Sequence, residues 1–218
     1  MKQSIYPKII KRFFDILLCL PACLVLSPLY LITAVGIRLS SPGPVFYRSK
    51  RRGKNGREFD FYKFRSMHET DNNKHMCVAD EERLFPFGQF IRRAKIDELP
   101  QLLNIIKGDM SIVGPRPMTL ASKMYTGPYE EVKSTRPGLT SPASLYDYTV
   151  GDTYKDNAAY KREVYPVKQK LELYYVRHEG FRYDASLIFR TGWTVISVVA
   201  GKKKFRPIPE LEHLEKEI

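Results

Sequence analysis

The longest apolar stretch of the chain runs from Ile16 to Ile37, and basic residues flank it on both sides. At about 1.5 Å of rise per residue, a helix of some 22 residues matches the roughly 30 Å hydrocarbon core of a bilayer. The flanking basic residues are Lys8, Lys11 and Arg12 before the run and Arg38, Arg48, Lys50, Arg51, Arg52, Lys54 and Arg57 after it. Lys and Arg next to a membrane segment favour the cytoplasmic side, so a straight span would force one flank across.

Two prolines interrupt this run, Pro21 and Pro28, and the second follows Ser27 near its middle. Proline lacks the backbone donor and clashes with the preceding turn, so it bends or breaks a helix. We therefore expect a re-entrant membrane helix within residues 1–40 that bends at Ser27-Pro28, with the Ser27 hydroxyl serving a freed backbone group. A kinked spanning helix is the alternative. A cleaved signal peptide is disfavoured, because Asp15 opens the run and no small-residue cleavage site closes it.

The pattern after this run predicts an α+β domain over residues 41–201. Residues 45–50 and 57–64 are expected to form a small β-hairpin, because Asn55-Gly56 tolerates positive φ. The other expected elements are a polar loop over 67–82, a short helix over 87–93, an amphipathic helix over 99–106 closed by Gly108, and a strand over 110–113.

The C-terminal part, from about residue 155, is expected to be mainly helical. One helix is expected near 167–178 and a second from Asp184, as its N-cap, to about Ala200. The second is too short and too charged to span a bilayer, since Arg190 lies within its apolar stripe. It either packs on the core or lies at the membrane interface with Trp193 as an anchor. Residues 202–218 are expected to form a charged tail of uncertain order.

The composition of the chain indicates which classes of partner this domain binds. The chain has 218 residues and a formal charge of +12, which implies nucleic acid, anionic lipid or a phosphate-rich substrate as a partner. The apolar run favours the last two over nucleic acid. Three cysteines, two of them in the apolar run, give no disulfide framework. The four histidines lack metal-ligand spacing, so a zinc site is not expected.

An acidic pair stands where the helix over 99–106 is expected to begin, in Asp97-Glu98-Leu99-Pro100. Proline is allowed in a first helical turn, so we expect Asp97 as the N-cap and Glu98 as the first helical residue. At a helix start both carboxylates can lean towards one ligand, and the local positive charge favours a phosphate or a metal complex. A cap followed by an acid is also common for structural reasons alone.

Four cations stand in short motifs of stiff or ordered residues. Lys63 and Arg65 share one face of the expected strand, Arg116 lies in Gly114-Pro115-Arg116-Pro117, and Arg136 begins Arg136-Pro137-Gly138. Each motif alone is weak evidence, since basic residues are usually solvated surface. Carboxylates and rigid cations together suit phosphoryl transfer. An acid holds Mg²⁺, cations neutralise the transferring group, and a carboxylate can attack phosphorus.

Taken in order over residues 8–200, these motifs resemble the bacterial sugar transferase family, the monotopic phosphoglycosyl transferases that start lipid-linked glycan assembly. The residues that carry the resemblance are Lys11-Arg12, Asp15, Ser27-Pro28, Tyr62-Lys63-Phe64-Arg65-Ser66-Met67, Asp97-Glu98-Leu99-Pro100-Gln101-Leu102, Lys107-Gly108-Asp109-Met110-Ser111, Gly114-Pro115-Arg116-Pro117 and Arg136-Pro137-Gly138-Leu139-Thr140. The short chain resembles the minimal form of the family.

The resemblance implies transfer of a phospho-sugar from a UDP-sugar to a polyprenol phosphate such as undecaprenyl phosphate, with release of UMP. Asp97 aligns with the family's nucleophile, which forms a covalent phospho-sugar intermediate, and Glu98 with its acidic partner. Mg²⁺ is the family's cation and would lie near Asp97. The family's re-entrant helix bends at a Ser-Pro pair, which implies a monotopic protein on the cytoplasmic face of the bacterial inner membrane, in contact with membrane lipids.

The chain departs from the family after Thr140. Ser141-Pro142-Ala143-Ser144 replaces a segment in which the family often has glycine and, a few residues on, glutamine, so the contacts of this loop and the sugar preference stay open. A tethered protein that binds nucleic acid or anionic lipid through residues 48–57 would explain the charge but not Asp97-Glu98. An inactive scaffold would not need the acidic pair. We therefore expect an enzyme with no nucleic-acid partner, and a homodimer stays open.

Overall fold

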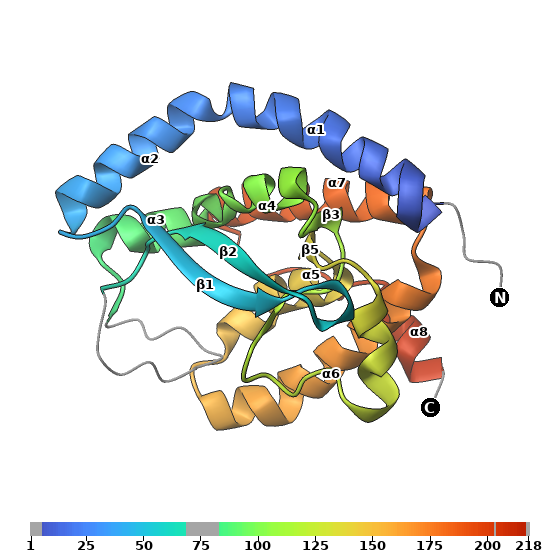
Figure 1. The fold of residues 1–218 in the computed structure, drawn as a ribbon. Helices are drawn as coiled ribbons and strands as arrows, with labels where there is room; N and C mark the ends of the chain where they lie inside the picture. Colours follow the sequence, from blue (N-terminus) through green and yellow to red (C-terminus); the bar gives the residue numbers. More distant parts are fainter. Residues whose placement is uncertain (1–5, 69–82, 203, 217–218) are drawn as a thin grey trace.

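The computed structural model describes residues 6–68, 83–202 and 204–216 and confirms a mixed α+β architecture, mostly helical with small sheets (Figure 1). Of the loop expected over 67–82, only Met67 and His68 are described. Met67 forms an isolated antiparallel bridge with Leu84. The rest of that expected loop lies outside the described residues.

The N-terminal apolar run forms two helices that arch over the rest of the domain (Figure 1). A π-helical turn over Tyr6–Ile10 leads into α1 (Lys11–Val25), and α2 (Ser27–Ser40) follows at an angle of 59°. Within the described residues no single helix has the length and apolar character needed to cross a bilayer, whereas α1 and α2 together do. We call this helix pair the arch.

The break between α1 and α2 falls at the predicted position. Pro28 has no N–H to donate to the carbonyl of Leu24, four residues earlier. The Ser27 hydroxyl donates to that carbonyl instead, at 2.8 Å. Pro28 thus removes one helical hydrogen bond, and the Ser27 hydroxyl satisfies the Leu24 carbonyl in its place. The sequence predicted both roles.

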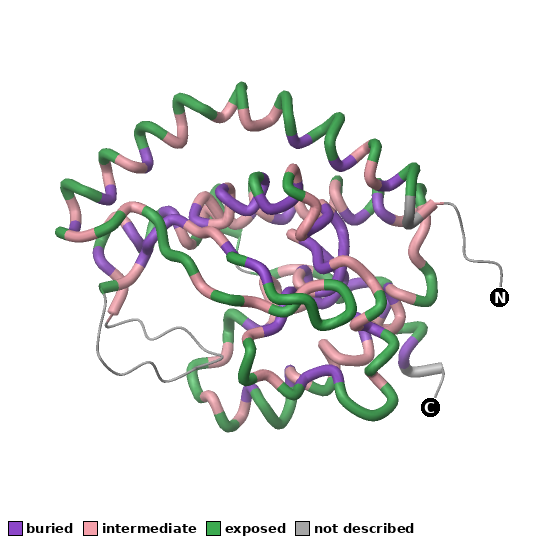
Figure 2. The backbone as a smooth tube through the Cα atoms, in the orientation of Figure 1, coloured by how far each residue is buried: buried purple, intermediate pink, exposed green. Residues whose placement is uncertain are grey.

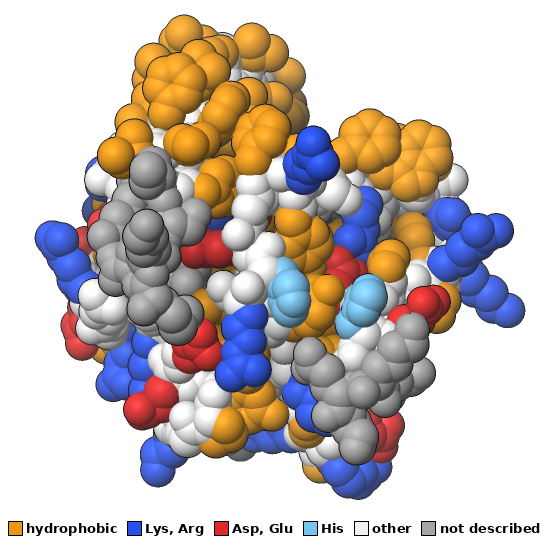
Figure 3. Space-filling view, turned by 90° about the vertical axis from the view of Figure 1, so that its right-hand side faces the viewer, with side chains coloured by type: hydrophobic (Ala, Val, Ile, Leu, Met, Phe, Trp, Pro, Cys, Tyr) orange, Lys and Arg blue, Asp and Glu red, His pale blue; other side chains and the backbone are white. Residues whose placement is uncertain are grey.

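The arch keeps one face on the domain and exposes the other (Figure 2). Cys19, Thr33 and Ile37 are buried on the inner face. The exposed apolar residues of the arch are Phe13, Ile16, Leu17, Leu18, Leu20, Leu24, Val25, Leu31, Ile32, Val35 and Leu39. Figure 3 shows hydrophobic side chains gathered at this top side of the molecule. An apolar surface of this extent is typical of an interface rather than of a water-exposed face.

Two polar residues of α1, Arg12 and Asp15, fasten the arch to the domain. The Arg12 guanidinium donates to the carbonyls of Ile105 and, at 2.7 Å, Ile106. The Asp15 carboxylate accepts from the Ser111 hydroxyl at 3.0 Å and from the N–H of Ile112 at 2.9 Å. In the sequence Arg12 was only part of a basic flank and a family motif, and Asp15 only part of a family motif. In the structure both residues bind the arch to the domain.

The two ends of the arch both contact the same domain. At the start of α1, the Lys11 ammonium lies 3.0 Å from the Asp184 carboxylate. At the end of α2, Ile37 packs with Phe64, Phe85 and Ile91 in one buried cluster. Both ends of the arch are therefore held by contacts with the same domain.

The strands form two small sheets. β1 (Phe46–Arg52) and β2 (Glu58–Phe64) pair antiparallel, with Phe46 opposite Phe64, and the turn between them has positive φ at Asn55 (54°) and Gly56 (79°). The predicted hairpin is confirmed. β4 (Met118–Thr119) pairs with the other edge of β1. β3 (Ser111–Val113), the predicted strand, pairs parallel with β5 (Gly138–Thr140).

Helices supply most of the remaining structure. They are α3 (Pro86–Arg93), α4 (Gln101–Lys107), α5 (Pro142–Thr149), α6 (Asn157–His178), α7 (Phe181–Val199) and α8 (Glu210–Lys216), with short 3-10 segments over Ile96–Glu98, Lys54–Gly56, Gly127–Ser134 and Gly151–Thr153. Gly108 ends α4 with a φ of 93°, as predicted. α6 begins ten residues before the predicted helix, because Asp156 caps it by accepting from the Ala159 N–H.

α7 corrects one assignment and resolves an alternative. It begins at Phe181, so Asp184 is a buried residue of its first turn rather than its N-cap. The positive end of the helix dipole favours an acid both at the N-cap and in the first turn. Sequence alone therefore does not distinguish these two positions. One side of α7 packs Leu187 into the core, while Phe189, Trp193 and Ile196 are exposed. The helix therefore has both a core face and an exposed apolar face.

The main core lies between α5, α6 and α7, around Ala143, Leu171, Tyr175 and Leu187. The segment beyond residue 202 takes part in it. Ile208 and Leu214 belong to the same buried cluster, and Glu210 of α8 forms a two-bond ion pair with Arg190 of α7. The tail that carried no structural assignment from sequence thus closes one side of the domain.

Candidate functional site

The acidic pair lies in the 3-10 turn η4 (Ile96–Glu98), between α3 and α4. Lys95 enters the turn in a left-handed conformation with a φ of 55°. α4 begins only at Gln101, and its first turn carries no side-chain cap, so the prediction that Asp97 caps this helix is wrong. Leu99 and Pro100 continue the tight turn instead, because a proline fits a turn as well as a first helical position.

The two carboxylates converge on the ammonium group of Lys63, whereas the sequence predicted convergence on a ligand. Lys63 Nζ lies 3.2 Å from Glu98 Oε1 and 3.7 Å from Asp97 Oδ2. Lys63 is in β2, which runs beneath the turn, so hairpin and turn together form the site. Burial lowers the pKa of Lys63, and the two acids oppose that effect.

Glu98 is a firmly held anion. Its two oxygens accept from the Arg116 guanidinium in a bidentate pair at 2.7 Å each. Gln101 Nε2 adds a third donor at 3.3 Å. Burial alone would raise the pKa of Glu98, but Arg116 and Lys63 outweigh it and hold that pKa well below its usual range. Glu98 therefore stays ionised, with every oxygen engaged.

Asp97 is held differently. Its carboxylate is 3% exposed, and Oδ1 has no hydrogen-bond partner among the described residues. Burial raises the pKa of Asp97, while Lys63 acts against the rise. A buried carboxylate oxygen without a partner costs free energy, which makes Asp97 Oδ1 a candidate for binding a ligand. Two neighbouring acids in such different surroundings are suited to different roles.

A second buried acid supports Arg116 from behind. Glu172 of α6 is fully buried, and its Oε1 accepts from the backbone N–H of Arg116 at 3.0 Å and from the Ser141 hydroxyl at 3.1 Å. Burial raises the pKa of Glu172 to about 7. Glu172 could not be recognised from the sequence, because an acid in a charged helix usually faces solvent.

The acidic pair is tied directly to the arch. Tyr30 of α2 donates its hydroxyl hydrogen to the carbonyl of Leu99 at 2.6 Å, one residue after Glu98. This bond fixes the height of the turn relative to the arch. The carboxylates consequently lie close under the apolar surface rather than at the far end of the domain.

The structure brings Lys63 and Arg116 to the acidic pair but not Arg65 or Arg136. Arg65 is 5% exposed and donates to the carbonyls of Ser41 and Pro42 at 2.7 Å each, so it holds the loop after α2. Arg136 is beside α1. Burial lowers its pKa and Arg12 adds to this, while Asp15 and Asp109 oppose it.

The described residues contain no group of three or more His, Cys, Asp or Glu side chains placed to hold a metal ion. Mg²⁺ does not require such a group, since it is often bound through one or two carboxylates together with water and substrate phosphates. The free Oδ1 of Asp97 is an oxygen of the right kind for that mode. The donor set therefore fits Mg²⁺ held jointly by Asp97 and a phosphorylated substrate.

Fold and site together define an α+β domain with a bent apolar helix pair above an acidic pair that two cations hold. The chain belongs to the bacterial sugar transferase family, because the model of that family matches residues 6–198. This finding confirms the resemblance carried by the motifs.

Named relatives are similar over most of this chain. A UDP-glucose:undecaprenyl-phosphate glucose-1-phosphate transferase of Xanthomonas campestris is 35% identical over 88% of this chain, but the match covers only 40% of that protein. The exopolysaccharide production protein PSS of Rhizobium leguminosarum is 37% identical over 89% of this chain and 98% of its own length. A UDP-N-acetylgalactosamine-undecaprenyl-phosphate N-acetylgalactosaminephosphotransferase of Aeromonas hydrophila is 34% identical over 86% of this chain and 44% of its own length.

Proposed function

We propose that this protein transfers a sugar 1-phosphate from a UDP-sugar to undecaprenyl phosphate, the reaction named for its relatives from Xanthomonas and Aeromonas. The match to the Rhizobium protein suggests exopolysaccharide production as the setting. The observation that carries the proposal is the contrast within the acidic pair: Glu98 is saturated by Arg116 and Lys63, whereas Asp97 keeps a buried oxygen free.

This contrast supports a two-step transfer. In the first step Asp97 attacks the phosphorus that bears the sugar, an Asp97 oxygen–phosphorus bond forms, and the bond to UMP breaks. In the second step an oxygen of undecaprenyl phosphate attacks the same phosphorus. The bond to Asp97 breaks, which restores the carboxylate and yields the polyprenol diphosphate sugar.

The cations provide the electrostatics that this chemistry needs. Lys63 stands beside both acids, so it can neutralise charge on the transferring phosphoryl group. Glu98, whose two oxygens both cations engage, keeps Lys63 and Arg116 in place beside Asp97. Mg²⁺, when bound at Asp97, would offset the charge of the diphosphate.

The arch supports a monotopic, re-entrant placement in the membrane. Its outer face is apolar, its two ends contact one domain, and the Tyr30–Leu99 bond keeps the acidic pair beneath it. A polyprenol tail stays in lipid while its phosphate reaches the headgroups, so a site at this height can meet it. By the positive-inside rule the basic domain faces the cytoplasm, on the inner membrane of a bacterium.

The test is a UMP-release assay with the full chain, a panel of UDP-sugars, undecaprenyl phosphate and Mg²⁺. We expect Asp97→Asn to abolish turnover and Glu98→Gln to reduce it by roughly 100-fold, the scale of losing one preorganised charge in an active site. Asp60→Asn makes the same chemical change at an exposed carboxylate of β2 and should leave turnover intact. Near-normal UMP release by Asp97→Asn would overturn the proposal.

A further inference from the structure

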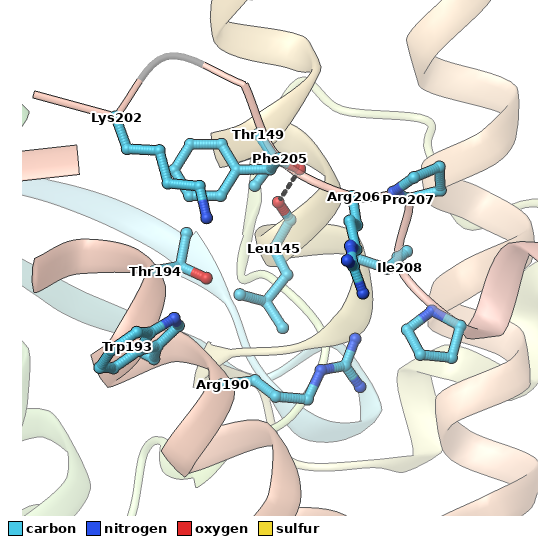
Figure 4. Close-up of a pocket in the computed structure, with 11 residues that line it drawn as sticks. Leu145, Thr149, Arg190, Trp193, Thr194, Lys202, Phe205, Arg206, Pro207 and Ile208 are labelled. Atoms are coloured by element: carbon cyan, nitrogen blue, oxygen red, sulfur yellow. Dashed lines mark hydrogen bonds between the residues drawn. The ribbon is translucent and has the colours of Figure 1, made fainter. Parts of the chain in front are cut away.

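A cavity of about 390 Å³ lies away from the acidic pair, between α7, the end of α5 and the segment over 202–209. Its lining includes Leu145 and Thr149 of α5, Trp193 of α7, and Lys202, Phe205 and Arg206 of the C-terminal segment. Figure 4 shows these side chains around one space, with the basic groups of Lys202, Arg206 and Arg190 directed into it. No bond among the described residues joins this lining to Lys63, Asp97, Glu98 or Arg116.

The cavity has an excess of positive charge. Arg190 is compensated, because both of its terminal nitrogens donate to Glu210, at 2.6 and 2.9 Å. The Lys202 ammonium lies 5.2 Å from the centre of the Phe205 ring. Within the described part of the chain, neither Lys202 nor Arg206 forms an ion pair. Two cations therefore stand over the cavity without an anionic partner among the residues that the structure describes.

The cavity also has an apolar side that continues onto the exposed face of α7. Leu145 and Ile208 are buried in its wall, 3% and 7% exposed. Trp193 is 62% exposed, and Phe189 and Ile196 are exposed on the same helix. A ligand that fits both halves has an anionic group for the cations and an apolar part that lies along α7.

We propose that this cavity binds the phosphodiester headgroup of an anionic phospholipid, with the phosphate between Lys202 and Arg206 and an acyl chain against Trp193. A guanidinium and an ammonium suit phosphate oxygens, and a bilayer supplies such lipids at high local concentration. The inference rests on the proposed membrane placement. The bound lipid would hold α7 at a fixed depth.

The chain carries its own reporter, because Trp193 is its single tryptophan. The full chain is reconstituted in phosphatidylcholine vesicles that contain a small fraction of lipid with brominated acyl chains. Bromine quenches tryptophan only at short range, so quenching reports lipid beside the cavity. A basic residue near the bilayer surface contributes roughly five-fold in affinity, so two contribute about 25-fold. Brominated phosphatidylglycerol should accordingly quench at about 25-fold lower mole fraction than brominated phosphatidylcholine.

Two double variants test whether Lys202 and Arg206 cause the preference for phosphatidylglycerol. In Lys202→Gln with Arg206→Gln, both brominated lipids should quench alike. Lys161→Gln with Arg162→Gln removes the same charge from the exposed start of α6 and should keep the preference for phosphatidylglycerol. UMP release by each variant in detergent verifies that it is folded.

Three results would overturn the inference: equal quenching of the parent protein by both lipids, a preference that survives Lys202→Gln with Arg206→Gln, or loss of the quenching by phosphatidylglycerol when UMP is added. The last would assign the cavity to the nucleotide. UMP release in the same vesicles separates this inference from the proposed function: turnover without lipid preference contradicts only the lipid site, whereas absence of turnover contradicts the function.

Discussion

Replacing Glu172 with glutamine tests whether a buried charge behind Arg116 sets the pH dependence of stability. Glu172 is fully buried, and its Oε2 has no hydrogen-bond partner among the described residues. Burial raises its pKa to about 7, although the Arg116 N–H and the Ser141 hydroxyl act against the rise. Glutamine keeps the acceptor oxygen for both donors and never ionises.

The direction of the pH effect on stability follows from the protonation of Glu172 in the folded and unfolded states. The folded protein, with a pKa near 7, binds a proton at Glu172 that the unfolded chain, with a pKa near 4.5, releases. Glu172 therefore contributes stability that is fully present below pH 4.5 and is lost as the pH rises through 7. Between pH 5 and pH 8 this loss amounts to about 2.5 kcal/mol, at 1.36 kcal/mol for each pKa unit. Glu172→Gln should not show it.

The assay is unfolding of the parent and the variant in one detergent at pH 5, 6, 7 and 8. The free energy of unfolding of Glu172→Gln, relative to the parent, should rise by about 2.5 kcal/mol from pH 5 to pH 8. Glu58→Gln changes an exposed glutamate of β2 and should give a flat difference. If the difference in free energy of unfolding between Glu172→Gln and the parent also stayed constant from pH 5 to pH 8, burial would not raise the pKa of Glu172 and the reasoning would be refuted.

Two further substitutions test the site and the arch. Arg116→Lys cannot reproduce the bidentate pair with Glu98, so UMP release should fall roughly 100-fold while the unfolding midpoint changes little. Unchanged turnover in Arg116→Lys would mean that the Arg116–Glu98 ion pair stabilises the fold and is not needed for the reaction. Ser27→Ala with Pro28→Ala restores the helical N–H for the Leu24 carbonyl and should straighten the arch. Cysteines placed at Gln3 and Lys54, labelled from the same side in the parent, should then be labelled from opposite sides in part of the population.

Features coded by a few adjacent residues could be predicted from the sequence. Asn55-Gly56 specifies the hairpin because both residues adopt positive φ, and Pro28 with Ser27 specifies the bend and its compensation. The convergence of Asp97 and Glu98 was also foreseen, but on a bound ligand rather than on Lys63. In each case local geometry restricts the chain strongly enough to leave few alternatives.

Features that depend on distant neighbours could not be predicted. Arg65 directly follows β2 rather than lying in it, and the carbonyls of Ser41 and Pro42 occupy its donors. Glu172 acquires its role only because α6 carries it to the backbone of Arg116, 56 positions away in the chain. Likewise, the cap assigned to Asp97 was wrong because Leu99 and Pro100 extend the turn before α4 begins.

The most direct test of the central claim is the intact mass of the protein after incubation with a UDP-sugar and Mg²⁺ but without undecaprenyl phosphate. The account predicts a population heavier by one sugar 1-phosphate, with the adduct mapped by peptide fragmentation to Asp97 and removed when undecaprenyl phosphate is added. Asp97→Asn should stay unmodified. Turnover with no adduct under these conditions, or an adduct on any other residue, would contradict the assignment of Asp97 as the nucleophile.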